Sequence, residues 1–191
     1  MGTLNELTNS ILVQIPPAAR FTPEDAQRII DNQAALLTFE DAIVAGFYEA
    51  LYSHGPTKAI FVEGERPDRE ETLRKWWRRT VSGPFDADYW GWQALVGLIH
   101  VKRKVKNVMM IGMWGWILTF LREAVTNEAS VDDELLVSFE RLAATVKALT
   151  AESYLEHYIK ALQNATGFEA KLLERMVATE VDDLVQSVRG S

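Results

Sequence analysis

The sequence ALVGLIHV, residues 94–101, points most directly to the fold and to the functional site. It is almost continuously apolar, is interrupted only by Gly97 and His100, and runs into the basic residues 102–104. Such a pattern is typical of a buried helix that emerges at a charged edge. An imidazole is costly to bury unless something satisfies its nitrogens, so His100 is either a hydrogen-bonded structural residue or a metal ligand.

Helical patterns lie on both sides of this stretch. Thr22 followed by Pro23 is a good helix start, and apolar residues recur every four positions from Phe39 to Leu51. Asp86 can cap the helix that contains His100. Two long amphipathic patterns follow, over residues 135–162 and 168–188. No period-two pattern of any length occurs, so the sequence predicts an all-α fold.

The chain length favours one globular domain, because 191 residues with 48% hydrophobic content can bury a substantial core. Pro16 and Pro17 close a mixed polar segment, so residues 1–20 are interpreted as an N-terminal arm. The globular domain is expected over residues 21–163. The C-terminal segment, residues 164–191, begins with a break at 164–167. Its helix suits a linker or a dimer contact.

Composition excludes several classes of function. With no cysteine, the chain has no disulfide, no thiolate metal site and no cysteine nucleophile. The net charge of −7 argues against general nucleic-acid binding. The most apolar stretch, residues 108–121, soon meets Arg122 and Glu123, and the N-terminus carries no secretion signal. We therefore expect a soluble, cytoplasmic protein without a membrane partner.

The three histidines have different sequence settings. His54 lies in a turn, and His157 follows Glu156 on the polar side of a long helix. Only His100 stands in an apolar environment. It is therefore the candidate ligand for a metal or cofactor, with a structural, hydrogen-bonded histidine as the alternative.

A family resemblance extends over roughly residues 20–185. The chain resembles the globin domain of globin-coupled sensors and protoglobins in both the order and the separation of its motifs. These motifs are Phe47-Tyr48-Glu49-Ala50-Leu51, Ser82-Gly83-Pro84-Phe85 with Tyr89-Trp90, Gly97-Leu98-Ile99-His100-Val101, Ser138-Phe139-Glu140-Arg141-Leu142 and Glu152-Ser153-Tyr154-Leu155. The resemblance implies a globin fold with an N-terminal extension and an extra C-terminal helix.

The resemblance also implies a site for haem b. His100 corresponds to the proximal iron ligand, and Tyr48 to the distal tyrosine that donates a hydrogen bond to a bound gas. Thr72 falls where some members place a second distal hydroxyl. Trp76 lies one turn beyond Thr72, where it either covers the distal side or fills the core. The predicted pocket is completed by Leu73, by Val96 on the proximal side, and by Met110.

The sequence departs from the family pattern just after His100. Members often follow the histidine with an arginine, a glycine and prolines, and then a tryptophan-tyrosine pair. Here residues 102–108 read KRKVKNV, and Met109-Met110 follow. Met110 thus replaces an aromatic hydroxyl. The basic run 102–106 either neutralises haem propionates, or meets a partner, or is a solvated loop.

The expected function is reversible binding of O2, CO or NO at haem iron, in a gas sensor or a single-domain globin. The alternative is a haem-free globin-fold module of a stress-signalling complex. Dedicated NO dioxygenase or peroxidase-like catalysis is not expected, because no reductase region or distal acid–base histidine is visible. A signalling output domain, separate or fused, remains open.

A homodimer is also expected from the resemblance. Trp114, Trp116, Phe120 and the face of residues 139–146 belong to helices that resemble the family's four-helix dimer interface. The alternative is that all of these side chains fill the intramolecular core.

Overall fold

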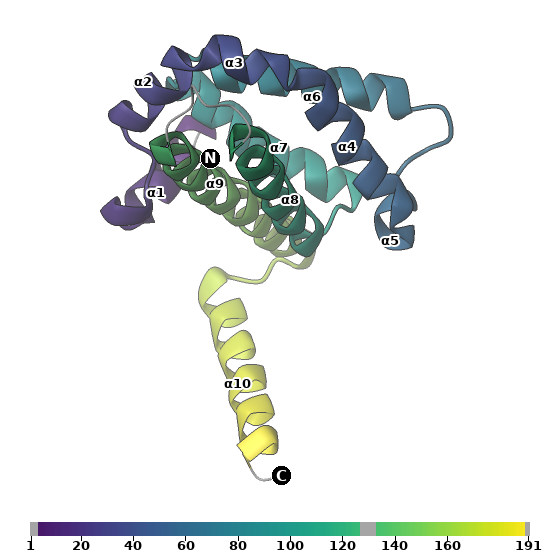
Figure 1. Ribbon diagram of the computed structural model, residues 1–191. Helices are drawn as coiled ribbons and strands as arrows, with labels where there is room; N and C mark the ends of the chain where they lie inside the picture. Colours follow the sequence, from purple (N-terminus) through teal and green to yellow (C-terminus); the bar gives the residue numbers. More distant parts are fainter. Residues whose placement is uncertain (1–3, 127–132, 190–191) are drawn as a thin grey trace. The chain divides into compact units, whose positions relative to one another are not determined.

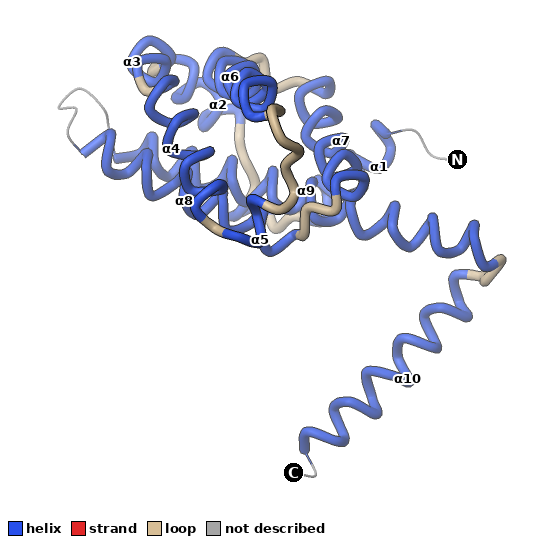
Figure 2. The backbone as a smooth tube through the Cα atoms, turned by 90° about the vertical axis from the view of Figure 1, so that its right-hand side faces the viewer, coloured by secondary structure: helices blue, strands red, loops and turns tan. Residues whose placement is uncertain are grey.

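The computed structural model describes residues 4–126 and 133–189, and within these ranges it contains helices and loops but no strand (Figures 1 and 2). The all-α prediction is confirmed. The helices are α1 Leu4–Gln14, a short 3-10 turn Pro17–Ala19, α2 Pro23–Asp31, α3 Gln33–Thr38, α4 Glu40–Ser53, α5 Gly55–Lys58, α6 Arg66–Ser82, α7 Ala87–Arg103, α8 Asn107–Thr126, α9 Asp133–Thr166 and α10 Ala170–Arg189.

The chain divides into two compact units, Met1–Tyr154 and Leu155–Ser191. The division falls inside α9, whereas the sequence reading placed it after residue 163. In the second unit, α9 ends at Thr166 and Gly167 adopts a positive φ of 73°. The described residues of α10 include none that is buried, and Val177, Leu184 and Val188 are exposed.

Side-chain caps fix the starts of α2 and α7. The Thr22 hydroxyl accepts a hydrogen bond from the Asp25 backbone N–H, and the Asp25 carboxylate accepts one from the Thr22 N–H. Asp86 accepts a hydrogen bond from the Tyr89 N–H at 2.9 Å. Both caps were expected from the sequence, because a short polar side chain satisfies the free amides of a helix's first turn.

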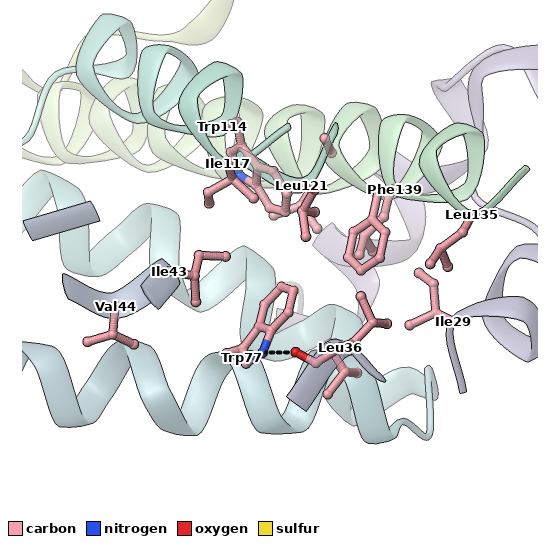
Figure 3. Packing of buried hydrophobic residues seen from close by; sticks show 14 of the residues in the cluster. Ile29, Leu36, Ile43, Val44, Trp77, Trp114, Ile117, Leu121, Leu135 and Phe139 are labelled. Atoms are coloured by element: carbon pink, nitrogen blue, oxygen red, sulfur yellow. Dashed lines mark hydrogen bonds between the residues drawn. The ribbon is translucent and has the colours of Figure 1, made fainter. Parts of the chain in front are cut away.

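The core of the first unit is built around Trp77 of α6 (Figure 3). Trp77 is fully buried, stacks on Phe139 of α9 at 6.0 Å between ring centroids, and donates its indole N–H to the Leu36 carbonyl at 3.1 Å. Trp114 and Leu121 of α8 belong to the same cluster. Four helices, α3, α6, α8 and α9, therefore meet in one apolar core.

The N-terminal segment differs from the expected arm. Residues 4–14 form α1, which lies against α7. Thr8, Ile11 and Ile15 are buried. Their spacing of three and four residues places them on one face of the helical turn, so this short segment covers part of the core despite its polar composition.

A close approach holds α7 against α9. A Cβ added at Gly97 would overlap the Ser153 hydroxyl and the Thr150 carbonyl. The Ser153 hydroxyl donates to the Ala94 carbonyl at 2.8 Å, which ties α9 to α7 beside this contact. Only glycine permits this separation, and the contact fixes the helix that carries His100.

Helix α8 is long and apolar enough over Asn107–Val125 to cross a membrane by length and composition alone, a test that core helices of soluble proteins also pass. One face of it, which includes Trp114 and Leu121, is buried in the core. The residues expected at a dimer contact divide accordingly. Trp114 and Phe139 lie in the intramolecular core, while Trp116 and Phe120 stack on each other and are only partly buried.

Candidate functional site

A cavity of about 330 Å³ opens among helices of the first unit, with walls from α4, α6, α7, α8 and α9. It brings together the seven residues that the sequence predicted for a cofactor pocket. These are Tyr48, Thr72, Leu73, Trp76, Val96, His100 and Met110. Their proximity is a property of the fold; their roles toward a cofactor stay predictions.

His100 lies on the α7 wall in a partly buried position. Burial, reinforced by the nearby positive charge of Arg103, lowers the pKa of its imidazole to about 4. The ring is therefore neutral at pH 7 and has a lone pair to offer. Its Nδ1 atom is buried and has no hydrogen-bond partner among the described residues. A purely structural histidine would have such a partner, so this atom favours a ligand role.

Tyr48 faces the same cavity from α4. Its side chain is 6% exposed, and its hydroxyl donates a hydrogen bond to the backbone carbonyl of Arg69 at 2.7 Å. Burial raises the pKa of this hydroxyl above its usual value, so the group remains a protonated donor at any physiological pH. The sequence predicted that this hydroxyl donates a hydrogen bond to a bound gas. In the structure it donates to the Arg69 carbonyl of α6.

The remaining predicted residues of α6 occupy different places on the wall. Thr72 is exposed, and its hydroxyl is bonded to the Asp68 carbonyl at 2.8 Å. Trp76 packs edge-on against Trp114 at 5.4 Å between ring centroids. Its indole N–H points to the Gln93 side-chain oxygen at 3.5 Å, across the gap to α7. Trp76 is therefore part of the cavity wall, in contact with the core on one side.

Two apolar side chains complete the predicted set. Val96 precedes His100 by one turn on α7, and Met110 is nearly buried on α8. Met109 and Met113 also line the cavity, although the sequence reading did not select them. Thioether side chains adapt to irregular space, so these three methionines suit a wall that receives a large apolar molecule.

Polar residues at the cavity include Gln93 and Arg69, which the sequence reading missed, and Arg103, which it named only within the basic run 102–106. Gln93 is 1% exposed, and its Nε2 has no hydrogen-bond partner in the described part of the chain. Arg69 and Arg103 also line the cavity. The positions of Gln93 and Arg103, seven residues before and three after His100, place them on the histidine's side of α7. That spacing is the signal that could have identified them.

The residues present fit a haem. No group of three or more histidine, aspartate or glutamate side chains within the described ranges could hold a metal ion by itself. A metal at His100 would therefore take its other donors from a ligand such as a porphyrin, which also needs apolar walls. The unpartnered imidazole nitrogen and the apolar walls satisfy these requirements.

Comparison with models of known protein families gives a match over most of the chain. The model of the family described as Protoglobin matches residues 12–164, a range that contains every residue of the cavity wall. A comparison with proteins of curated function found no match.

Proposed function

The chain belongs to the Protoglobin family, a family of haem-binding globins, and on this basis we propose that it binds haem b through His100 and takes up O2, CO or NO reversibly. The observation that carries the proposal is the neutral imidazole of His100, with a buried and unpartnered nitrogen, in the wall of an apolar cavity. When bound, haem supplies an iron centre that coordinates diatomic gases.

His100 acts as the protein's ligand to the cofactor. Deprotonation is a requirement for metal binding, and the lowered pKa of about 4 means that no proton has to be removed at neutral pH. The close contact of Gly97 with α9 holds the helix beneath the imidazole. The ring is thereby presented from a fixed wall of the cavity.

Tyr48 supplies the hydrogen-bond donor on another wall. A bound gas that carries partial negative charge is stabilised by such a donor, most strongly where water is excluded. Phe47, Leu51 and Ile117 provide apolar surface in the same cavity. To donate to a gas, the Tyr48 hydroxyl has to leave the Arg69 carbonyl, so gas affinity depends on the balance between the two acceptors.

The proposal extends to a homodimer that senses the gas. On α8, the side chains of Val108 and Ile111 are 72% and 45% exposed. Gly112 and Gly115 have open space where a side chain would be, so a second copy can approach the backbone there. Light scattering of the purified protein tests this: a mass of one chain at micromolar concentration would contradict it.

Absorption spectra test the central proposal. The protein is measured as isolated, reduced, and reduced under CO, beside His100→Ala and the exposed control His157→Ala. A haem band that shifts with CO in the parent and the control, and is lost or altered in His100→Ala, supports the assignment. A protein that stays colourless after haem addition would contradict it and favour the haem-free interaction module.

A further inference from the structure

Two arginines and one glutamate meet at the cavity. Glu65 precedes α6, Arg69 lies on its first turn, and Arg103 is the last residue of α7. The Arg103 Nη2 atom is 2.6 Å from Glu65 Oε1, and its Nη1 atom is 3.1 Å from Glu65 Oε2. Arg69 Nε is 3.8 Å from the same Oε2. One carboxylate is thus shared by two guanidinium groups.

This group of three carries a surplus positive charge. Glu70, the next acidic residue on α6, is bonded to Arg66 at 2.7 Å and does not compensate it. The Arg69 Nε–H is buried and makes no hydrogen bond to any residue in the described ranges. The Arg69 side chain is partly exposed and its ion pair with Glu65 is too long for a hydrogen bond, so a second anionic acceptor close to Nε would find a favourable position at Arg69.

The surplus charge belongs to the same cavity as His100. Arg103 follows His100 by three residues and shares its side of the helix, and both line the cavity. By contrast, Lys102, Lys104 and Lys106 of the basic run are exposed and do not line it. The arrangement suits a ligand with an apolar body, a metal at its centre and carboxylates at its edge.

We propose that Arg69 and Arg103 form a carboxylate-binding subsite of this cavity, and that Glu65 occupies it in the haem-free chain until a carboxylate of the cofactor replaces it. The inference rests on the proposed haem function and assigns the ends of the cofactor to particular residues. The bidentate geometry between Arg103 and Glu65 shows that the fork is already oriented for a carboxylate.

The exchange is energetically balanced at Arg103 and favourable at Arg69. Replacing Glu65 with another carboxylate on Arg103 keeps the number of charge-assisted hydrogen bonds. The incoming group additionally reaches the unpartnered donor of Arg69. Glu65 therefore competes with the cofactor for the two arginines. Removing the charge of Glu65 should slow haem loss, whereas removing an arginine should speed it.

The test measures the rate of haem loss to an excess of a haem-scavenging apoglobin, for haem and for its dimethyl ester. Arg69→Met is expected to speed haem loss about 10-fold, since one charge-assisted bond contributes about 1.5 kcal/mol or more. Arg103→Met is expected to speed it less, about 3-fold, because Glu65 takes back that guanidinium as the cofactor leaves. Lys102→Met removes the same charge next to Arg103 without touching the cavity, and is expected to change the rate less than about 2-fold. Glu65→Gln is expected to slow haem loss several-fold.

The ester has no carboxylate, so its loss should differ little among these proteins. The double variant Glu65→Gln with Arg103→Met leaves neither partner of that pair charged, and should lose haem faster than Glu65→Gln alone, in which Arg103 has no competing carboxylate. This variant separates a folding defect caused by an unpaired charge from loss of the subsite.

Two results would overturn the subsite: arginine variants that behave like Lys102→Met, or a Glu65→Gln protein that loses haem faster, as expected if Glu65 only orients Arg103. In either case a parent protein with a CO-sensitive haem band would leave the proposed function intact. Absence of that band in the parent would overturn both.

Discussion

The Tyr48 hydroxyl and the Arg69 backbone carbonyl are joined by a hydrogen bond of 2.7 Å that links α4 to α6 at the edge of the cavity. Arg69, which provides the acceptor, lines the cavity, and so do Thr72 and Leu73 in the next turn of α6. The residue that would stabilise a gas is therefore also a structural tie, and its replacement affects both properties.

Tyr48→Phe is expected to speed O2 dissociation from the haem-loaded protein by about 5-fold. One net hydrogen bond of about 1 kcal/mol is lost, and the effect is limited because the parent must first release the Arg69 carbonyl. Stopped-flow displacement of O2 by CO measures the rate. Tyr52→Phe is the control. The Tyr52 ring stacks on Phe61, which lines the cavity, but Tyr52 itself is not part of the cavity wall. An unchanged rate in Tyr48→Phe would remove this donor from the mechanism.

Gly97→Ala is expected to destabilise the fold by about 2 kcal/mol or more. The added methyl group would overlap the Ser153 hydroxyl and the Thr150 backbone, which cannot move aside without separating α7 from α9. Urea unfolding followed by circular dichroism measures the free energy.

The matched control is Gly55→Ala at the start of α5, where the new methyl group meets nothing within 4 Å. It should be neutral or stabilising by up to about 1 kcal/mol, because alanine is the better helix former. Equal effects at the two positions would contradict the close packing of α7 on α9.

The stability of the haem-free protein is expected to fall between pH 7 and pH 5 through His100. Its pKa of about 4 lies below the usual value of 6.5, so near pH 5 the unfolded chain binds a proton that the folded chain does not. This contribution is absent above about pH 7 and grows as the pH falls toward 4. At pH 5 it is about 2 kcal/mol.

Urea titrations at the two pH values, on the parent and on His100→Leu, isolate this contribution. Leucine cannot titrate, so the variant should show a smaller loss of stability between pH 7 and pH 5. The same pH dependence in both proteins would mean that His100 is not desolvated in the haem-free state.

Trp77→Phe is expected to lower the free energy of unfolding by about 2–4 kcal/mol. The smaller ring leaves a cavity beside Phe139. It also lacks the indole N–H that donates a hydrogen bond to the Leu36 carbonyl (Figure 3). Thermal unfolding of the haem-free protein measures the loss. A change below about 0.5 kcal/mol would show that the core repacks around position 77.

The sequence predicted the helical fold, the two capped helix starts and the buried setting of His100, because each depends on spacing along a single helix. The pairs that complete the cavity depend on tertiary packing. Glu65 and Arg103 are 38 residues apart, and Trp76 meets Gln93 across two helices. No local pattern pairs such residues. The helical N-terminal segment was missed because its buried face consists of only a few residues in a polar context.

The cavity also affects the amount of this protein that accumulates in a cell. A hollow of about 330 Å³ beside the core lacks the contacts that an occupant would make, so the empty chain opens more often than the filled one. Proteases degrade opened chains. We therefore expect the cellular half-life of the protein to lengthen when a porphyrin precursor is supplied, which a pulse-chase experiment would measure. Porphyrin supply would then set the abundance of the protein as well as its activity.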